Sequence, residues 1–116
     1  MLVDFSDLII TVVICPQDLR MGFSKLSILA LENFYIDVSK GNDCVIFVSK
    51  HRNICKIIYA DKNGINLLTR KLHQGTYQRL LARLTGPAIK VLSKAELLSY
   101  LDGESIMVQR NNALLG

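Results

Sequence analysis

The first apolar stretch of the chain is LIITVVIC, residues 8–15, a nearly continuous run that is rich in β-branched side chains. Such a run is typical of a strand that is covered on both faces. Pro16 follows at once and cannot continue the backbone ladder, so we expect the strand to end there. The run is also far too short to span a bilayer.

A helical period replaces this pattern over residues 22–33. The apolar residues recur three or four positions apart, on one face of a helix: Phe23, Leu26, Ala30 and Phe34. Asp18 and Ser24 are candidates for the cap of its first turn, because both side chains can accept a hydrogen bond from a free backbone N–H. We therefore expect a helix that docks on the sheet through its apolar face.

Three strand-like runs follow, at residues 44–50, 54–61 and 64–72. The connections are only HRN, between the first and second runs, and KNG, between the second and third. Connections this short force neighbouring strands to be antiparallel, which predicts a β-meander. The Asn-Gly pair in the second connection further predicts a tight turn with a positive φ.

The segment that follows the meander has two interpretations. Residues 77–84 have good helix propensity, but they also suit a strand that pairs with AIKVL, residues 88–92, across a Gly-Pro turn. A second helix is clearer in SKAELLSYLDG, where Ser93 and Glu96 form a capping box and Gly103 marks the stop.

Together these elements predict one α+β domain over residues 1–106, in the order β-α-β-β-β-(β)-(β)-α. Its sheet is expected to be antiparallel, to contain the meander, and to pack against two helices. The 116 residues suit a single domain, and a hydrophobic content of 50% suffices for a core. The final stretch, residues 107–116, is expected to be a loose tail.

Charge is distributed unevenly along the chain. Residues 1–43 carry 3 basic and 6 acidic side chains, a net of −3, and residues 96–116 carry 1 basic and 3 acidic, a net of −2. Residues 44–95 carry 10 basic side chains against 1 acid, a net of +9, so the chain as a whole has a net charge of +4. Such a basic block can mark a surface that binds a polyanion, but a solvated sheet face whose lysines maintain solubility gives the same signal.

The meander should bring two parts of this block together. Its direction reverses at each turn, so the first turn and the far end of the third strand lie at the same end of the sheet. The candidate nucleic-acid-binding residues of the block are Lys50, Arg52, Lys56, Arg70, Lys71 and Arg79. Tyr59 and Tyr77 are candidates for stacking on bases, although half-buried packing with a wet hydroxyl is the more usual role of tyrosine.

Catalytic and metal-binding residues are not evident in the sequence. Acids are sparse in the middle of the chain, where Asp61 is explained as a turn residue, so we expect neither a catalytic site nor enzyme activity. The histidines and cysteines match no standard zinc spacing, so we expect no metal and no other cofactor. Cys15, Cys44 and Cys55 lie in apolar stretches, which suggests reduced, buried thiols. The N-terminus has acids where a signal peptide has basic residues, and we expect a cytoplasmic protein that does not associate with membranes.

Longer motifs in the chain resemble a known family. PQDLRMGFSKL, residues 16–26, is similar to the opening of the first helix in the TnpB-type accessory proteins of the insertion-sequence-66 family of bacterial transposable elements. CKIIYADKNGINLLTRKLHQGTY, residues 55–77, is similar to their central block, and LSKAELLSYLDGESI resembles their final helix. The resemblance spans residues 8–106, and the matched family-motif residues include Asp18, Arg20, Asp61, Gly64 and Gly75. The chain departs from the family where Ala60 replaces a Trp and His73 replaces a Glu.

The resemblance implies an accessory protein of transposition, encoded beside a separate transposase and required with it, with no known catalysis of its own. Two roles stay open. We favour binding to DNA, with the element ends as one target, through the basic sheet end. The alternative is a module that docks on the transposase or on a second copy of itself, which predicts an exposed apolar patch, for instance along Leu97, Leu98 and Leu101, unless these leucines pack on the sheet. The family pattern also favours an extended strand at residues 77–80.

Overall fold

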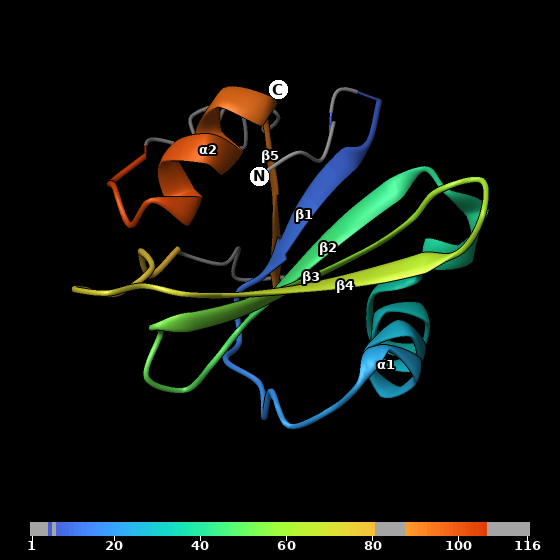
Figure 1. The fold of residues 1–116 in the computed structure, drawn as a ribbon, viewed down its shortest axis with the longest axis horizontal. Helices are drawn as coiled ribbons and strands as arrows, with labels where there is room; N and C mark the ends of the chain where they lie inside the picture. The colour runs from blue at the N-terminus through green and yellow to red at the C-terminus, as the bar shows by residue number, and fades with distance from the viewer. Residues whose placement is uncertain (1–4, 6, 81–87, 107–116) are drawn as a thin grey trace.

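Residues 5, 7–80 and 88–106 are described by the computed structural model, in which a five-stranded sheet lies between two helices (Figure 1). The first half of the chain forms β1 (Ile9–Val13), α1 (Phe23–Phe34), the 3₁₀ turn η1 (Val38–Lys40) and β2 (Asp43–Val48). The second half forms β3 (Ile54–Ala60), β4 (Ile65–Lys71), β5 (Ile89–Leu92) and α2 (Lys94–Leu101).

The strands are ordered β4-β3-β2-β1-β5 across the sheet. The strands β2, β3 and β4 are antiparallel neighbours, as the short connections predicted, so the β-meander is confirmed. The strand β1 is parallel to β2, because α1 carries the chain back to the other end of the sheet before β2 begins. The strand β5 pairs antiparallel with the free side of β1. The predicted α+β class is therefore confirmed, but the sheet is mixed and not antiparallel throughout, because β1 runs parallel to β2.

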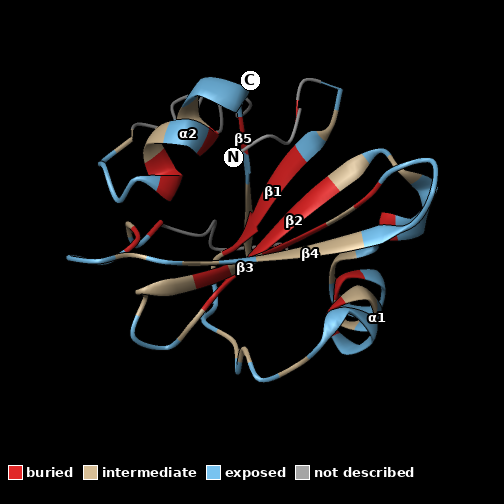
Figure 2. Ribbon diagram, in the orientation of Figure 1, coloured by how far each residue is buried: buried red, intermediate tan, exposed pale blue. Residues whose placement is uncertain are grey.

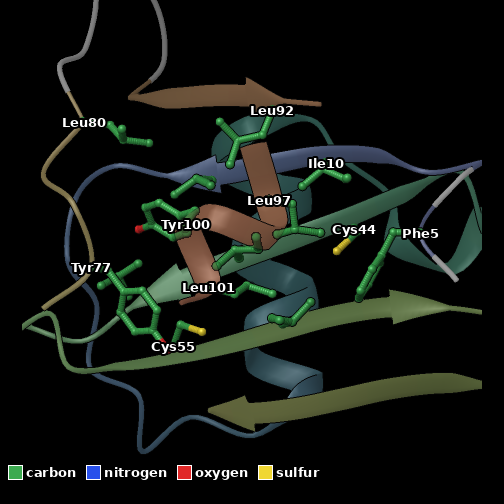
Figure 3. Close-up of a cluster of buried hydrophobic side chains, with 14 residues drawn as sticks. Phe5, Ile10, Cys44, Cys55, Tyr77, Leu80, Leu92, Leu97, Tyr100 and Leu101 are labelled. Atoms are coloured by element: carbon green, nitrogen blue, oxygen red, sulfur yellow. The ribbon is translucent and has the colours of Figure 1, made fainter. Parts of the chain in front are cut away.

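The centre of the sheet is buried on both faces (Figure 2). On one face, called here the α2 face, Leu97 and Tyr100 of α2 pack in a cluster with sheet residues such as Ile10 and Cys55 (Figure 3). On the other, the α1 face, Leu26 of α1 packs in a second cluster. The first apolar run is thus covered on both faces, as predicted.

Alternation along β3 and β4 assigns their side chains to these two faces. Cys55 and Ile57 belong to the α2-face cluster, whereas Ile58 belongs to the α1-face cluster. Arg70 is paired with Cys55 across the two strands, so it lies on the α2 face. Its neighbour Lys71 lies on the α1 face. Two consecutive basic residues of β4 therefore have different surroundings.

The two helices begin in different ways. At α2 the predicted capping box is confirmed, since Ser93 Oγ accepts the N–H of Glu96 at 3.1 Å and Glu96 Oε1 accepts the N–H of Ser93 at 2.7 Å. At α1 the predicted cap is wrong, because the N-cap residue is Gly22, which has no side chain to accept a hydrogen bond. Ser24 lies inside the first turn, and the Asp18 carboxylate is used in an earlier turn.

The turn between β3 and β4 is closed by a side chain. Neither Asn63 nor Gly64 has a positive φ, so this part of the Asn-Gly prediction is wrong. The Asp61 carboxylate accepts the N–H of Asn63 at 2.8 Å, the N–H of Gly64 at 3.0 Å and the side-chain amide of Asn66 at 3.1 Å. These bonds, led by the one from the Asn63 backbone, lower the pKa of Asp61 and confirm that it is a turn residue.

Residues 77–80 are neither helix nor strand, so both interpretations are wrong for this part of the chain. Residues 81–84 and the expected tail at 107–116 lie outside the described residues. The Tyr77 N–H donates to the Arg52 carbonyl at 2.6 Å, and its side chain is buried in the α2-face cluster. These tertiary contacts override the local helix propensity of the segment.

Candidate nucleic-acid interface

Three basic segments meet at one end of the sheet, called here the basic end (left in Figure 1). They are the β2–β3 turn at residues 49–53, the end of β4, and residues 76–80. The N–H of Leu72 donates to the carbonyl of Asn53 at 2.9 Å, which holds the end of β4 beside the turn. The predicted proximity of the first turn of the meander to the far end of its third strand is therefore confirmed.

Hydrogen bonds fix the shape of the β2–β3 turn. The Arg52 N–H donates to the Ser49 carbonyl at 2.9 Å, and Ser49 Oγ accepts the N–H of Ile54 at 3.2 Å. Arg52 has a φ of 59°, in the left-handed region. Because its carbonyl accepts the N–H of Tyr77, the third segment, which carries the exposed Arg79, is held against the turn.

Arg70 lies at this end but is bound within the molecule. Its Nε donates to the Leu101 carbonyl at 2.8 Å, and its Nη2 donates to Asp102 Oδ1 at 3.0 Å. The C-terminus of a helix has free carbonyls that attract a cation, and the α2-face position of Arg70 lets it reach them. Arg70 therefore links β4 to α2, with 40% of its side chain exposed.

Lys56 is also bound within the molecule. It lies within β3 on the α1 face, where its Nζ donates to the Met21 carbonyl at 3.0 Å. This bond ties the segment before α1 to the sheet. Two of the predicted nucleic-acid-binding residues, Lys56 and Arg70, thus have intramolecular hydrogen-bond partners.

The other predicted cations gather around the turn: Lys50, Arg52, Lys71 and Arg79. Arg52 is half-buried, and the remaining three are exposed. None of the four forms a salt bridge with another described residue. Both histidines of the chain are exposed close by in sequence. These four cations are the predicted ones for which no hydrogen bond or salt bridge from the side chain to another described residue is seen.

The family-motif residues Asp18 and Arg20 form a closed pair at the surface. Arg20 donates to the Asp18 carboxylate from Nε at 3.0 Å, from Nη2 at 2.6 Å and from its backbone N–H at 3.0 Å. The Arg20 side chain, followed by its backbone N–H and with a smaller contribution from Lys50, holds the pKa of Asp18 well below its usual range. The charge of Arg20 is therefore largely neutralised within this pair.

The motif glycines serve different turns. Gly75 has a φ of 77°, which favours glycine, and it reverses the chain between β4 and Tyr77. Gly64 has neither a positive φ nor a neighbour that a side chain would meet. Of these two motif glycines, Gly75 is therefore the one whose backbone conformation favours glycine.

The two tyrosines considered for base stacking are used elsewhere. Tyr77 is 1% exposed and stacks on Tyr100, with ring centroids 5.4 Å apart and 23° between the ring planes. Tyr59 is half-buried and packs edge-to-face on Phe5 at 5.9 Å. Burial raises the pKa of both Tyr77 and Tyr100. Tyr77 is therefore not available to a nucleic-acid base, and the ring of Tyr59 is in contact with Phe5.

Two of the three cysteines are buried thiols, as predicted. Burial raises the pKa of the Cys44 thiol to about 12, and it also raises the pKa of Cys55. The prediction is wrong for Cys15, which is exposed because β1 ends two residues earlier at Val13. No group of three or more His, Cys, Asp or Glu residues that could hold a metal ion occurs in the described parts of the chain.

Acidic residues gather at the opposite end of the sheet, called here the acidic end and defined by Asp37, Asp43 and Asp61. Asp37 caps η1, Asp43 begins β2, and Asp61 closes the β3–β4 turn. Lys40 and Lys62 are exposed among them. Counted with these two lysines, the acidic end has a net charge of −1, and the length of the strands separates it from the cations of the basic end.

The sequence did not point to Leu101, Asp102 or Tyr100 as parts of the basic end. Arg70 and Asp102 are 32 positions apart, so no local spacing connects them. One signal was present, because an acid at the C-terminus of a helix is unfavourable for the helix dipole and suggests a nearby cation. Tyr100 carried no such signal.

The fold and this surface define a small α+β protein with a basic sheet end. Among protein-family models, the one described as IS66 Orf2 like protein matches residues 9–111. The chain therefore belongs to the IS66 Orf2-like family, whose members are accessory proteins associated with transposition of an insertion sequence, and the resemblance in its motifs is confirmed. Neither the curated proteins nor the solved structures that were compared gave a match. Within the described residues, neither helix has the length and apolar character needed to cross a membrane.

Proposed function

We propose that this accessory protein binds DNA through phosphate contacts at the basic end. The observation that carries the proposal is the meeting of three cationic segments around the β2–β3 turn, where Lys50, Arg52, Lys71 and Arg79 form no salt bridge with a described residue. Each cation that contacts a phosphate releases condensed counterions, which favours binding to DNA of any sequence.

The same geometry favours the DNA backbone over the bases as the main contact. Tyr77 is buried, and the Arg70 side chain is hydrogen-bonded to the end of α2. Neither side chain is therefore positioned to read a base. Phosphate contacts position a protein on the duplex but carry no sequence information. Any preference for the ends of the element would then come from the shape of the DNA or from the transposase partner.

The test compares two double variants with the same change of charge. Lys50→Ala/Lys71→Ala removes two exposed lysines from the basic end, and Lys40→Ala/Lys62→Ala removes two from the acidic end. Fluorescence anisotropy measures binding to labelled element-end DNA and to unrelated duplex DNA over a series of salt concentrations. The basic-end variant is expected to bind more weakly and to lower the slope of log affinity against log salt by about 1 per lost contact.

The acidic-end variant is expected to keep the wild-type affinity and slope. Equal binding by both variants, or no binding by the wild type at low salt, would refute the proposed interface. Arg70→Ala is not suitable for this test, because it also breaks the link between β4 and α2.

Docking on the transposase is the second candidate function, and a different observation favours it. Apolar side chains lie exposed along α1 and its C-cap, three and four residues apart: Ile28, Leu31 and Tyr35. This is not the patch expected on α2, where Leu97 and Leu101 are buried and Leu98 is exposed. An apolar stripe of this kind suits a protein partner better than DNA.

A binding titration with the purified transposase of the element tests this role. Leu31→Ser/Tyr35→Ser is expected to lose transposase binding while it keeps the circular dichroism spectrum of the wild type. Retention of full transposase binding by this variant would exclude the α1 surface as the docking site.

A further inference from the structure

The strand β4 is the outermost strand of the sheet on the side away from β5 (Figure 3). It pairs with β3 over its whole length, and the register runs without a bulge from Ile65 to Lys71. It contains no proline. Open sheet edges in monomeric proteins are usually short, bulged, covered or interrupted by proline, because a regular free edge is a template for another strand.

Two hydrogen bonds show which backbone groups of β4 are free. The Leu72 N–H donates to the Asn53 carbonyl at 2.9 Å, and the Asp61 N–H donates to the Gly64 carbonyl at 2.9 Å, so the even-numbered residues of β4 face β3. The groups that point away from the sheet belong to Ile65, Leu67, Thr69 and Lys71. No backbone bond from another described residue reaches them.

The sequence of β4 allows two copies to pair antiparallel without placing like charges opposite each other. A two-fold axis at Leu68 aligns all the residues of the strand with those of the second copy and places Leu68 opposite itself. Thr69 then lies opposite Leu67, and Lys71 lies opposite Ile65, so no like charges face one another. A register centred on Arg70 would place two arginines opposite each other, which is unfavourable.

The charges at the two ends of the molecule are compatible with the same arrangement. Antiparallel pairing puts the basic end of one copy beside the acidic end of the other, so Lys71 lies near the turn that Asp61 closes. Lys50 and Arg52 belong to the turn between β2 and β3, one strand away from the paired β4 edges, so this pairing does not cover them. Both α2 faces lie on the same side of the joined sheet, because paired residues in a continuous sheet share a face.

We propose that two copies of this chain form a dimer by pairing their β4 edges antiparallel about Leu68, which produces one continuous ten-stranded sheet from two five-stranded sheets. The interface is isologous, as in most homodimers. The inference does not rest on DNA binding and is tested in the absence of DNA.

The first experiment measures molar mass by light scattering over a concentration series, with the full chain and two variants. Thr69→Pro removes an outward-facing N–H, and a proline is tolerated in an edge strand at such a position. Thr69→Val keeps this N–H and is the matched control. The wild type and Thr69→Val are expected to be dimers, and Thr69→Pro is expected to be a monomer with the same circular dichroism spectrum. A monomeric wild type, or a folded Thr69→Pro that dimerises as the wild type does, would overturn the proposal.

The second experiment tests the register and remains decisive if Thr69→Pro fails to fold. Leu68→Cys is made together with Cys15→Ser, and mild oxidation is expected to crosslink it, because directly opposed non-hydrogen-bonded residues have Cα atoms about 4.5 Å apart, within disulfide range. Asn66→Cys in the same background is the control, since the two Asn66 positions would be about 13 Å apart along the strands. Equal crosslinking of the two variants, or none in Leu68→Cys, would contradict the register.

Discussion

Arg70 and Lys71 are adjacent in the chain but point to opposite faces of β4. Arg70 reaches the C-terminus of α2 and donates to Leu101 and Asp102, whereas Lys71 is exposed. Of these two neighbouring basic side chains, Arg70 therefore has a structural role, whereas Lys71 is in contact with solvent. The period of two along a strand decides which residue has which role.

Arg70→Ala is expected to lower the free energy of unfolding by about 1–2 kcal/mol, since it removes two charge-assisted hydrogen bonds at a partly exposed site. Lys71→Ala is expected to change it by less than about 0.5 kcal/mol, as is usual for an exposed side chain. Urea denaturation followed by circular dichroism measures both. An equal loss of unfolding free energy in the two variants would show that Arg70 does not hold α2.

The three cysteines are expected to differ sharply in reactivity. Cys15 is exposed, whereas Cys44 and Cys55 are buried with raised pKa values, and the thiolate is the reactive form. An aromatic disulfide reagent should modify one thiol quickly in the folded protein and the other two after denaturation. Cys15→Ser should abolish the fast phase, and a fast phase that persists in this variant would contradict the assignment.

The pKa of Asp18 is expected to lie below that of an ordinary aspartate and to rise in Arg20→Ala, because the Arg20 side chain stabilises the charged carboxylate. A folded-state pKa below the unfolded value gives a contribution to stability that is present above the unfolded pKa and is lost as pH falls through the folded pKa. A carboxyl-carbon NMR titration of the wild type and the variant measures the shift. An unchanged pKa in Arg20→Ala would refute the cause.

At the scale of elements, α2 is fixed at both ends by different means. Its first turn closes on itself through Ser93 and Glu96, and its last turn is held by Arg70 from β4. Between these two contacts it packs on the sheet through Leu97 and Tyr100, which are buried. A short helix needs such support, because an isolated segment of this length is not stable in water.

Ser93→Ala is expected to lower the free energy of unfolding by about 1 kcal/mol, because it leaves the N–H of Glu96 without its acceptor. Ser93→Gly is expected to cost only a few tenths of a kcal/mol, since glycine is itself a good N-cap residue. Urea denaturation measures which of the two variants has the lower free energy of unfolding. A larger loss for glycine than for alanine would show that the cap is not the reason for the effect.

At the scale of the whole molecule, one sheet supports both cores. Leu26 lies in the α1-face cluster and Leu97 in the α2-face cluster, and β1 and β2 contribute residues to both. The two helices do not need to touch each other for their stabilities to be coupled. We therefore expect a cavity on one face to affect the packing on the other.

Leu26→Ala and Leu97→Ala are each expected to lower the free energy of unfolding by about 2–5 kcal/mol, as is usual for fully buried leucines. Because the sheet is shared, each variant should still unfold in one cooperative transition, now shifted to lower temperature. Calorimetry, with fluorescence and circular dichroism compared on the same samples, measures this. Separate transitions for the two faces would contradict a single cooperative unit.

Local chemistry was enough to predict much of this protein. Both helices, the first strand and the meander follow from apolar periodicity and very short connections, and the capping box of α2 follows from two residues three positions apart. The family follows from motifs such as PQDLRMGFSKL. The proximity of the β2–β3 turn to the end of β4 was predictable because each short turn reverses the chain.

Only the tertiary structure decided which cations are free. Lys56 and Arg70 belong to the same basic block as Lys50 and Lys71, but their partners are Met21 and the end of α2, 35 and 31 positions away in the chain. Tyr77 is likewise buried by tertiary contacts, which override the local helix propensity of its segment. Such pairings depend on how helices dock on a sheet, and that is set by packing across the whole fold instead of by neighbours in sequence.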